Sequence, residues 1–550
     1  MLNYTLKGNN EGNLIDNIFI NRGITNKDLI LNPKETSKTS PFIYNNMEEG
    51  IIALNKYINR KILLLVDSDT DGFCSAAEIY LGVKMINPNA NITYLIHSNK
   101  EHGLTPEIME QIMEISPDMV IIPDAGSNDY EQHKILKLKN ITTLIIDHHE
   151  AEYLSKDAIV INNQLSLNPL SNKTLSGGGM VLKFFEAYDE KYNTKTANKI
   201  LDLAALAMIG DSMLMTEEET RYYCKYGMLN PQNNFIIHNA GKDVSFKDVS
   251  WKISPVINAI IRMGDQETKQ LLFEALINNI KPMQIEKRGK GLVNTDTLGY
   301  LDVMVSRYKG RQRTQVNKVV DKGDITDTRF CVIYFAPEDF NKNLSGLVAG
   351  KLATKYNKPA LVLSKTEELY AGSARALHTF NMRSTMEDFE SVQYATGHEP
   401  AFGVGFKCED LELFLEECSH HEPPKIAEYE VDRIYSEDVE GKDIFDILSL
   451  DNEWSKGFEQ PLFAIEFSNI SIKNINFYAK NTVCIQTPSG IKILKFNCSD
   501  DEIFELNSME YANITVIVQF ERDKFGKPCL SVIDWNIQDN SPEDLSDWWI

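Results

Sequence analysis

Three aspartates at alternate positions follow an aliphatic run in the stretch ILLLVDSDTDG, at Asp67, Asp69 and Asp71. One aspartate at the end of a strand is ordinary, because turns favour Asp and Gly. Three carboxylates so close together repel one another unless a cation neutralises them, and oxygen-rich clusters of this kind bind hard divalent ions. The stretch therefore favours a metal site over a simple turn.

Two further clusters carry possible ligands. The stretch IIDHHEA places His148 and His149 directly after Asp147 at the end of an apolar run. Carboxylates and imidazoles without a cysteine favour Mn²⁺ or Mg²⁺ over structural zinc. The run ILDLAALAMIGDS ends at Asp211, where burying an unpaired carboxylate would be costly, although an ordinary helix end is the alternative interpretation.

The elements that must position these residues alternate between strand and helix. Aliphatic runs at 62–66, 92–96, 119–122 and 142–146 are separated by helix-like stretches such as FCSAAEIYLGVKMI. This alternation predicts an α/β fold with a doubly wound parallel sheet, in which ligands bind at the carboxyl ends of the strands. The four runs are followed by DSDTDG, HSNKEHG, PDAGS and DHHE, so we expect these clusters to converge on one edge.

Composition limits the class of protein. A chain of 550 residues is long enough for two to four domains. The formal net charge of −23 argues against a protein that coats nucleic acid non-specifically, although a locally basic cleft remains compatible with it. The segment 281–322 is such a basic region, with a solvated helical face as an equal alternative. The 8 cysteines form no Cys-x-x-Cys pair, which argues against structural zinc and disulfides.

The chain contains no apolar run of membrane-spanning length, and its first residues, MLNYTLKGNNEGN, lack the pattern of a signal peptide. We therefore expect a cytoplasmic protein with no membrane partner.

Taken in order, DSDTDG, DAGS, DHH and GDS resemble the four motifs of the DHH phosphoesterase superfamily. The later segments SGLVAGKLATKYNKPALVLS, YAGSARA and YATGHEPAFGVGF resemble the DHHA1 accessory domain of the RecJ-like single-stranded-DNA exonucleases. The motifs span residues 46–407. The resemblance implies a catalytic DHH domain followed by a second α/β domain that holds the substrate.

The resemblance also implies a two-metal site for Mn²⁺ or Mg²⁺. The implied ligands are Asp67, Asp69, Asp71, Asp124, His148 and Asp211. Asp124 is the candidate to bridge the two ions, and Asp124, His148 and His149 are the implied catalytic residues. His149 would orient or protonate phosphate oxygens rather than bind metal tightly.

Five residues are implied to bind the substrate: Ser373, Arg375, Gly397, His398 and Lys100. A guanidinium with nearby backbone N–H groups suits a terminal phosphate. Two departures from the family pattern are present: the residues before Gly397 are not glycines, and Lys100 occupies a position where arginine is expected. From the residues alone, Arg375 would be an ordinary strand residue and His398 an ordinary turn residue.

After two prolines near residue 423, short alternating strands predict an OB-like β-barrel, a fold whose usual role is to bind single strands. Phe477, Tyr478 and Phe520 are candidate base platforms, although aromatic residues in strands more often belong to the core. The last residues, SPEDLSDWWI, form an acidic-aromatic tail that suits either a partner surface or packing on the barrel.

The expected organisation has six parts. They are an N-terminal arm (1–45), a DHH catalytic domain (46–280), a basic helical connector (281–325), a DHHA1-like substrate-binding domain (326–425), an OB-like β-barrel (426–540) and the acidic-aromatic tail (541–550).

The expected function is metal-dependent hydrolysis of single-stranded DNA to mononucleotides, in recombination, repair or replication, with the 5′→3′ direction implied by the resemblance alone. One alternative is a DHH-type phosphodiesterase acting on dinucleotides or short oligonucleotides. Another is a binding protein built on an inactive DHH domain, which the filled aspartate positions disfavour. The expected partner is single-stranded DNA, the candidate protein partners are a single-strand-binding protein or a helicase, and the chain is expected to act as a monomer.

Overall fold

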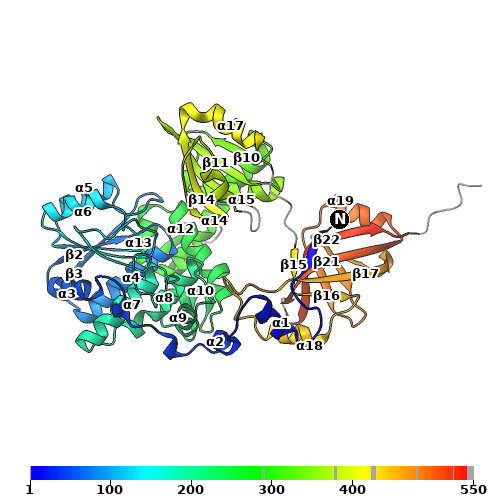
Figure 1. The fold of residues 1–550 in the computed structure, drawn as a ribbon, viewed down its shortest axis with the longest axis horizontal. Helices are drawn as coiled ribbons and strands as arrows, with labels where there is room; N and C mark the ends of the chain where they lie inside the picture. Colours follow the sequence, from blue (N-terminus) through cyan, green and yellow to red (C-terminus); the bar gives the residue numbers. More distant parts are fainter. Residues whose placement is uncertain are drawn as a thin grey trace, which may run out of the picture.

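The computed structural model describes residues 2–541, apart from 288, 290, 377–380, 423–428, 479, 480 and 524. Figure 1 shows a sheet with its helices in blue and cyan, a smaller unit above in yellow-green, and a further sheet in orange and red. The predicted acidic-aromatic tail lies outside the described residues, except for Ser541.

The first sheet is parallel, and its strands lie in the order β3-β2-β4-β5-β6. These strands are β2 (Lys61–Val66), β3 (Asn91–Ile96), β4 (Met119–Pro123), β5 (Thr142–Asp147) and β6 (Ile159–Asn162). Successive residues of β2 enter different cores, Leu64 on one face and Leu63 and Leu65 on the other. Because both faces are buried at the centre of the sheet, the central strands β2 and β4 are apolar almost throughout. The predicted parallel α/β sheet is confirmed.

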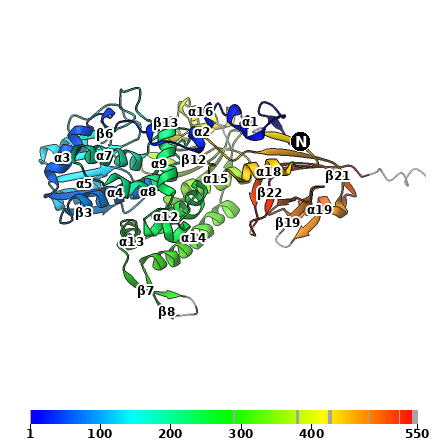
Figure 2. The ribbon, with the colours of Figure 1, turned by 90° about the horizontal axis from the view of Figure 1, so that it is seen from below.

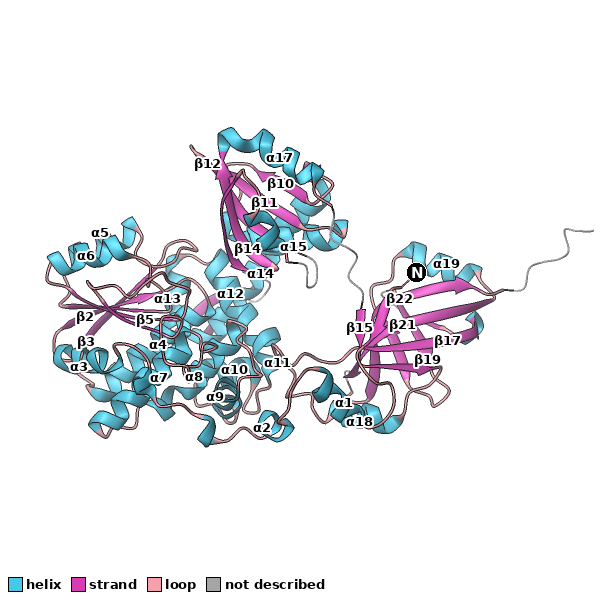
Figure 3. Ribbon diagram, in the orientation of Figure 1, coloured by secondary structure: helices cyan, strands magenta, loops and turns pink. Residues whose placement is uncertain are grey.

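Helices cover both faces of this sheet (Figure 3). One face packs against α5 (Pro106–Ile115) and α6 (Tyr130–Leu138), and the other against α3 (Met47–Tyr57), α4 (Thr70–Ile86) and α7 (Gly177–Tyr192). A helical region follows, comprising α8 (Ala197–Gly210), α9 (Glu218–Met228), α10 (Asn234–Ala240), α11 (Phe246–Asp248), η3 (Val249–Ile253), α12 (Ser254–Met263) and α13 (Gln266–Leu276). It shares the core on the α4 side of the sheet.

The segment predicted as a basic helical connector begins as a hairpin. Strands β7 (Pro282–Lys287) and β8 (Gly291–Asp296) pair with each other and lead into α14 (Thr297–Lys322). Figure 2 shows the hairpin projecting from the body of the molecule.

Of the helices in the described chain, none has both the length and the apolar character needed to cross a membrane.

The second sheet has the strand order β13-β14-β12-β11-β10-β9. Its strands are β9 (Ile325–Asp327), β10 (Val332–Ala336), β11 (Ala360–Lys365), β12 (Leu369–Arg375), β13 (Val392–His398) and β14 (Ala401–Lys407). Only β10 and β11 pair in parallel among the described pairings of this sheet. Its helices are α15 (Ser345–Tyr356), α16 (Met382–Glu387) and α17 (Leu411–His420). This is a second α/β unit, as predicted.

The C-terminal sheet has the strand order β16-β17-β21-β22-β20-β19-β18. Its strands are β16 (Arg433–Ser436), β17 (Phe463–Ser471), β18 (Asn476–Tyr478), β19 (Thr482–Gln486), β20 (Lys492–Lys495), β21 (Tyr511–Arg522) and β22 (Pro528–Asp539), with helices α18 (Gly441–Leu448) and α19 (Asp500–Ser508). Within the described residues the pairings leave β16 and β18 as edges, so they do not close the predicted barrel.

The aromatic candidates of this sheet lie in different environments. Phe477 and Tyr478 on the edge strand β18 are 39% and 47% exposed. Phe520 is fully buried and stacks on Phe463 with ring centroids 4.1 Å apart, so it belongs to the core rather than to a base platform.

The N-terminal residues pack on the C-terminal sheet rather than on a core of their own. Strand β1 (Tyr4–Leu6) pairs with β15 (Tyr429–Val431), while α1 (Leu14–Asn21) and α2 (Lys27–Leu31) contribute apolar side chains to the core beneath α18. Strands far apart in the sequence are thereby joined, which a linear pattern of residues does not reveal.

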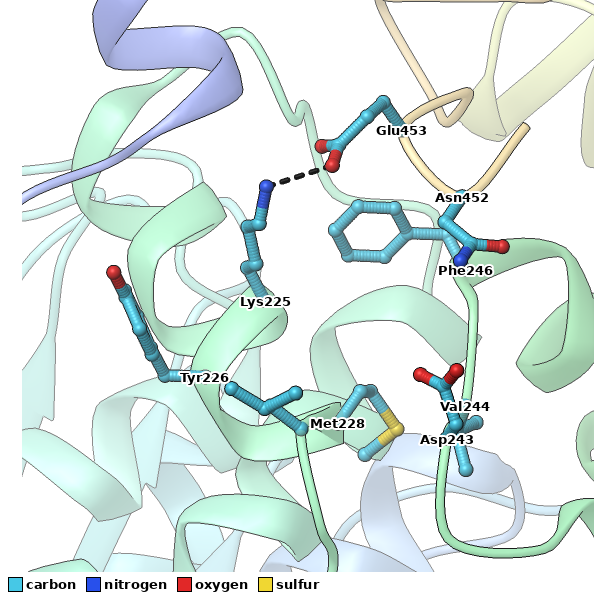
Figure 4. A pocket seen from close by; sticks show the side chains of 9 residues that line it. Lys225, Tyr226, Met228, Asp243, Val244, Phe246, Asn452 and Glu453 are labelled. Atoms are coloured by element: carbon cyan, nitrogen blue, oxygen red, sulfur yellow. Dashed lines mark hydrogen bonds and ion pairs between the residues drawn. The ribbon is translucent and has the colours of Figure 1, made fainter. Parts of the chain in front are cut away.

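A buried ion pair links the helical region to the segment between α18 and β17 of the C-terminal unit. Arg221 Nη2 on α9 donates to Glu453 Oε2 at 2.7 Å, and Lys225 Nζ lies 2.6 Å from Glu453 Oε1 (Figure 4). A cavity of about 180 Å³ beside the pair is lined by Met228 and Phe246, among other residues. Because Arg221 is fully buried, losing Glu453 would leave a buried charge unpaired.

Candidate active site

The predicted residues gather at the carboxyl ends of β2, β4 and β5. The chain passes from β2 outward to β3 and returns to β4 on the other side of β2, so the strand order reverses between β2 and β4. Ligands in open α/β sheets bind at such a switch point. Asp67 and Asp69 follow β2, Asp124 follows β4, and His148 and His149 follow β5.

Asp67 and Asp69 form one group of possible ligands together with His102, whose donor atoms all lie within 4.8 Å of one another. Asp67 is buried and accepts from Gly103 N at 3.2 Å and interacts with His102 Nδ1. Asp69 caps α4 and accepts from Gly72 N at 2.8 Å. Burial raises the pKa of Asp67 despite its contact with His102.

Asp71 is held by the first turn of α7. Its carboxylate accepts from Ser176 Oγ at 3.0 Å, Gly177 N at 2.7 Å and Gly178 N at 2.8 Å. The N–H groups at the start of a helix have no partner within the helix, and the helix dipole is positive there. Both features favour an anion at this position. A Cβ atom at Gly177 would lie 2.5 Å from both Cβ and Oδ1 of Asp124, so the close approach requires glycine.

Asp124 lies at the centre of the cluster in a left-handed backbone conformation, with φ of 64°. Such a conformation is uncommon outside glycine, and Asp and Asn tolerate it best. The side chain is 1% exposed, yet neither carboxylate oxygen has a hydrogen-bond partner among the described residues. Burial, followed by the charges of Asp71, Asp69 and Asp67, raises its pKa well above the ordinary value. A buried carboxylate without donors is the expected result where a cation is the natural partner.

His148 completes the group around Asp71 and Asp124. Its Nε2 lies 3.1 Å from Asp124 Oδ1 and 3.6 Å from both Asp71 Oδ2 and Asp211 Oδ2. Burial lowers the pKa of His148, which keeps a ring nitrogen free to act as a ligand. Asp211 caps the end of α8, and burial with the charges of Asp71 and Asp69 raises its pKa to about 8.

His149 points to a different partner from its neighbour. Its Nδ1 lies 2.8 Å from Asp147 Oδ1, and the same carboxylate accepts from the backbone N–H groups of His148 at 2.7 Å and Ser127 at 3.1 Å. Burial alone would raise the pKa of Asp147, but the hydrogen bond and charge of His149 outweigh it and lower this pKa. Burial would lower the pKa of His149, but Asp147 raises it to about 10. His149 is therefore a cation whose ring is held in place by Asp147.

Three cations lie close enough for their charges to act on one another, and one of them, Lys100, lies near Asp67 and Asp69. Lys100 follows β3, Arg262 lies on α12, and Arg375 ends β12 of the second sheet. Partial desolvation, then the charge of Arg262, lowers the pKa of Lys100, and Arg375 lowers it further. Desolvation and the charge of Arg375 likewise lower the pKa of Arg262. Mutually destabilising cations in one place indicate a site for an anion.

The other predicted substrate-binding residues lie in the second sheet. Ser373 pairs with Val362 and Gly403 in the strands that flank β12. Gly397 has φ of 128° and pairs with Phe402, which only glycine does without strain. The backbone of His398 ends β13, but its side chain lies outside the described residues. Among the described residues of the second sheet that are predicted to bind substrate, only Arg375 has a charge that acts on Lys100 and Arg262.

Sequence reasoning missed His102, Arg262 and the turn Ser176–Gly178. From the sequence alone, His102 in HSNKEHG could equally line the site or be an ordinary polar loop residue, and it is not among the predicted ligands. Arg262 lies in an apolar helix with no motif around it. The run SGGGM at 176–180 carries a detectable signal, because three glycines at a helix start are unfavourable unless the backbone must approach something closely.

Comparison with known proteins agrees with this geometry. Residues 61–208 match the DHH family, N-terminal domain. A prophage protein of Bacillus subtilis, YorK, whose name describes a single-strand DNA-specific exonuclease, is 30% identical over 94% of both chains. The chain belongs to the RecJ-like exonucleases of the DHH family. The single-stranded-DNA-specific exonuclease RecJ of Bacillus subtilis is 24% identical to this RecJ-like protein, over 72% of this chain and 51% of its own.

The fold has a solved counterpart as well. The crystal structure of RecJ in complex with Mn²⁺ from Thermus thermophilus matches with a TM-score of 0.73 at 16% identity, over 96% of this RecJ-like chain and 76% of that one.

Proposed function

We propose that this protein is a metal-dependent exonuclease that hydrolyses single-stranded DNA to mononucleotides, in the 5′→3′ direction, during DNA recombination, repair or replication. The observation that carries the proposal is the convergence of buried carboxylates and His148 around Asp124, whose two carboxylate oxygens have no hydrogen-bond donor among the described residues. The relatives named above as single-strand DNA-specific exonucleases support the choice of substrate.

The donor set fits two divalent ions, Mn²⁺ or Mg²⁺. Asp67 and Asp69 would hold one ion, Asp71, His148 and Asp211 the other, and Asp124 would bridge them. Carboxylate oxygens with one imidazole and no thiolate suit these metals. When bound, the ions would generate a hydroxide nucleophile at neutral pH and neutralise charge on the leaving 3′-oxygen. His102 is an additional candidate ligand beside Asp67.

The protein's own residues position the substrate. His149, held by Asp147, would donate a hydrogen bond to a phosphate oxygen near the cluster. Lys100, Arg262 and Arg375 would hold another phosphate group of the strand. The remaining contacts, from Ser373, Gly397 and His398, are assigned from the second sheet by the family pattern.

The C-terminal sheet is the proposed module for holding the strand away from the active site, in the manner of an OB-like fold. The exposed rings of Phe477 and Tyr478 on β18 support this role, because single strands bind by stacking bases on aromatic side chains. A single-strand-binding protein or a helicase remains a proposed partner.

The test is the digestion of an oligonucleotide labelled at one end or the other, with Mn²⁺ or Mg²⁺, by the parent, by Asp124→Ala and by Asp339→Ala. Asp339 is an exposed aspartate and serves as the matched control. Mononucleotides released from the 5′ end by the parent and by the control, and abolished in Asp124→Ala, support the proposal. Cleavage of dinucleotides while long strands survive would instead establish the alternative phosphodiesterase, and binding without cleavage would establish an inactive DHH domain.

A further inference from the structure

Helix α14 carries a run of basic residues that the active site does not use. Between 307 and 322 the sequence contains six cations and one acid, Asp321. The cations are Arg307, Lys309, Arg311, Arg313, Lys318 and Lys322, and all six are exposed. This run lies in a chain with 79 acidic and 56 basic residues.

Helical geometry places four of these cations on one face. At 3.6 residues per turn, Arg307, Arg311, Lys318 and Lys322 fall within a narrow arc, and the 15 positions from the first to the last extend over about 22 Å. We call these four residues the α14 ridge. An adjoining side of α14, about 110° around the helix axis from the ridge, packs into the molecule through the buried residues Leu301, Val305, Tyr308, Val316 and Val319.

The ridge is not neutralised by the protein. In the described part of the chain, no carboxylate lies within ion-pair distance of any of its four members. Arg307 and Arg311, and likewise Lys318 and Lys322, are like charges four residues apart, which destabilises a helix. A solvated helical face in so acidic a chain would more naturally alternate opposite charges. The arrangement therefore indicates an external anion.

The hairpin β7–β8 lies beside Arg307, the first residue of the ridge. Arg307 Nη2 donates to the backbone oxygen of Glu286 at 2.5 Å, which ties the helix to the hairpin. Figure 2 shows α14 along one side of the molecule, with the hairpin projecting at one end of it. The surface is thus a long helix with a projecting strand pair.

We propose that the α14 ridge binds the phosphate backbone of duplex DNA, as a second nucleic-acid site outside the active site. A duplex is a stiff rod that carries one charge per about 1.7 Å of its axis, and a straight row of cations matches it. A single strand is bound by exposed aromatic platforms, whereas the two aromatic residues of α14 are Tyr308, which is buried, and Tyr300, which is half-buried. The site goes beyond the proposed hydrolysis and would hold the protein on DNA that flanks a single-stranded region.

The test compares the parent with the triple variant Arg311→Gln, Lys318→Gln, Lys322→Gln. Arg307 is kept because it braces the hairpin, and glutamine keeps a similar helix propensity. Binding to a short blunt-ended duplex is measured by fluorescence anisotropy in EDTA over a range of salt. Each lost phosphate contact flattens the slope of log K against log salt by about 0.9, so three contacts predict a change of about 2.7 and at least tenfold weaker binding at low salt.

The matched control is Lys134→Gln, Lys195→Gln, Lys199→Gln, which removes the same charge from exposed lysines of the DHH domain. A parent that fails to bind duplex, or a control that loses as much affinity as the ridge variant, would overturn the proposal. Equal loss for a single strand of the same length would overturn the assignment to duplex. Digestion of a short labelled single strand, expected to be the same in parent and ridge variant, reports separately on the proposed exonuclease.

Discussion

Glu78 offers a quantitative test of how the active-site region is built. It lies on the side of α4 that packs against α7 and α8, is fully buried, and has no hydrogen-bond partner for either carboxylate oxygen among the described residues. A Cβ atom at Gly178 would lie 2.7 Å from Glu78 Oε1, so the carboxyl is closely enclosed. Burial, followed by the charges of Asp71 and Asp202, raises the pKa of Glu78 well above its ordinary value. Without metal, burial therefore favours the protonated form of Glu78 in the folded protein.

The sign of the effect on stability follows from proton linkage. The ordinary glutamate pKa is 4.5, so above that pH the unfolded chain loses a proton that the folded chain keeps. The free energy of unfolding then falls by about 1.4 kcal/mol per pH unit until the folded pKa is reached. Glu78→Gln removes this dependence. Between pH 5 and pH 7 the variant should gain stability on the parent, by at most about 2.5 kcal/mol, the limit set by the ordinary pKa of 4.5 in the unfolded chain.

The assay is urea unfolding in EDTA at both pH values, followed by far-UV circular dichroism, with Glu110→Gln as a control. Glu110 is exposed on α5, so its replacement should leave the difference between the two pH values unchanged. A Glu78→Gln variant that gains nothing at pH 7 relative to pH 5 would show that the carboxyl is ionised or paired in the folded state, and the reasoning would be wrong.

Three further results are expected. Gly177→Ala should abolish metal-dependent digestion without removing a ligand, whereas Gly179→Ala, where the added Cβ meets the flexible Met208 side chain at 3.0 Å, should keep most of it; equal activities would contradict this. Asp147→Asn should lower the pKa of His149 from about 10, measured by NMR titration, and reduce the rate about 10²-fold. Arg262→Gln should raise KM more for a 5′-phosphorylated than for a 5′-hydroxyl oligonucleotide, a difference that steady-state kinetics will detect.

The sequence predicts the catalytic sheet well because its signals are local. Strands buried on both faces are mostly apolar, and the residues that follow them are polar. The apolar runs and the polar residues after them therefore indicate the same strand ends. The order of the four acidic motifs then places Asp67, Asp124 and His148 on one edge. The structure places His148 Nε2 3.1 Å from Asp124 Oδ1, and Asp67 lies near enough for its charge to raise the pKa of Asp124.

The remaining parts of the site depend on contacts between distant segments. Arg262 reaches Lys100 and Arg375 from a helix whose sequence is dominated by core residues, and the turn at 176–178 approaches Asp71 from more than a hundred positions away. The C-terminal strands were recognisable by alternation, but alternation does not determine whether edge strands meet. Barrel closure depends on strand tilt and register, which the sequence does not encode locally.

The residues Asp147, His148 and His149 show why a motif of possible ligands is not a list of ligands. His148 turns toward Asp71, Asp124 and Asp211, while His149 turns toward Asp147. Asp147 itself accepts four hydrogen bonds, from three backbone N–H groups and the His149 ring, which leaves it little capacity for a cation. The hydrogen bond and charge of His149 outweigh burial and lower the pKa of Asp147, whereas burial and the charges of the neighbouring carboxylates raise the pKa of Asp124. Asp147 therefore positions other residues of the site, whereas Asp124 suits a cation. The hydrogen bonds of the two carboxylates reveal this difference, and their positions in the sequence do not.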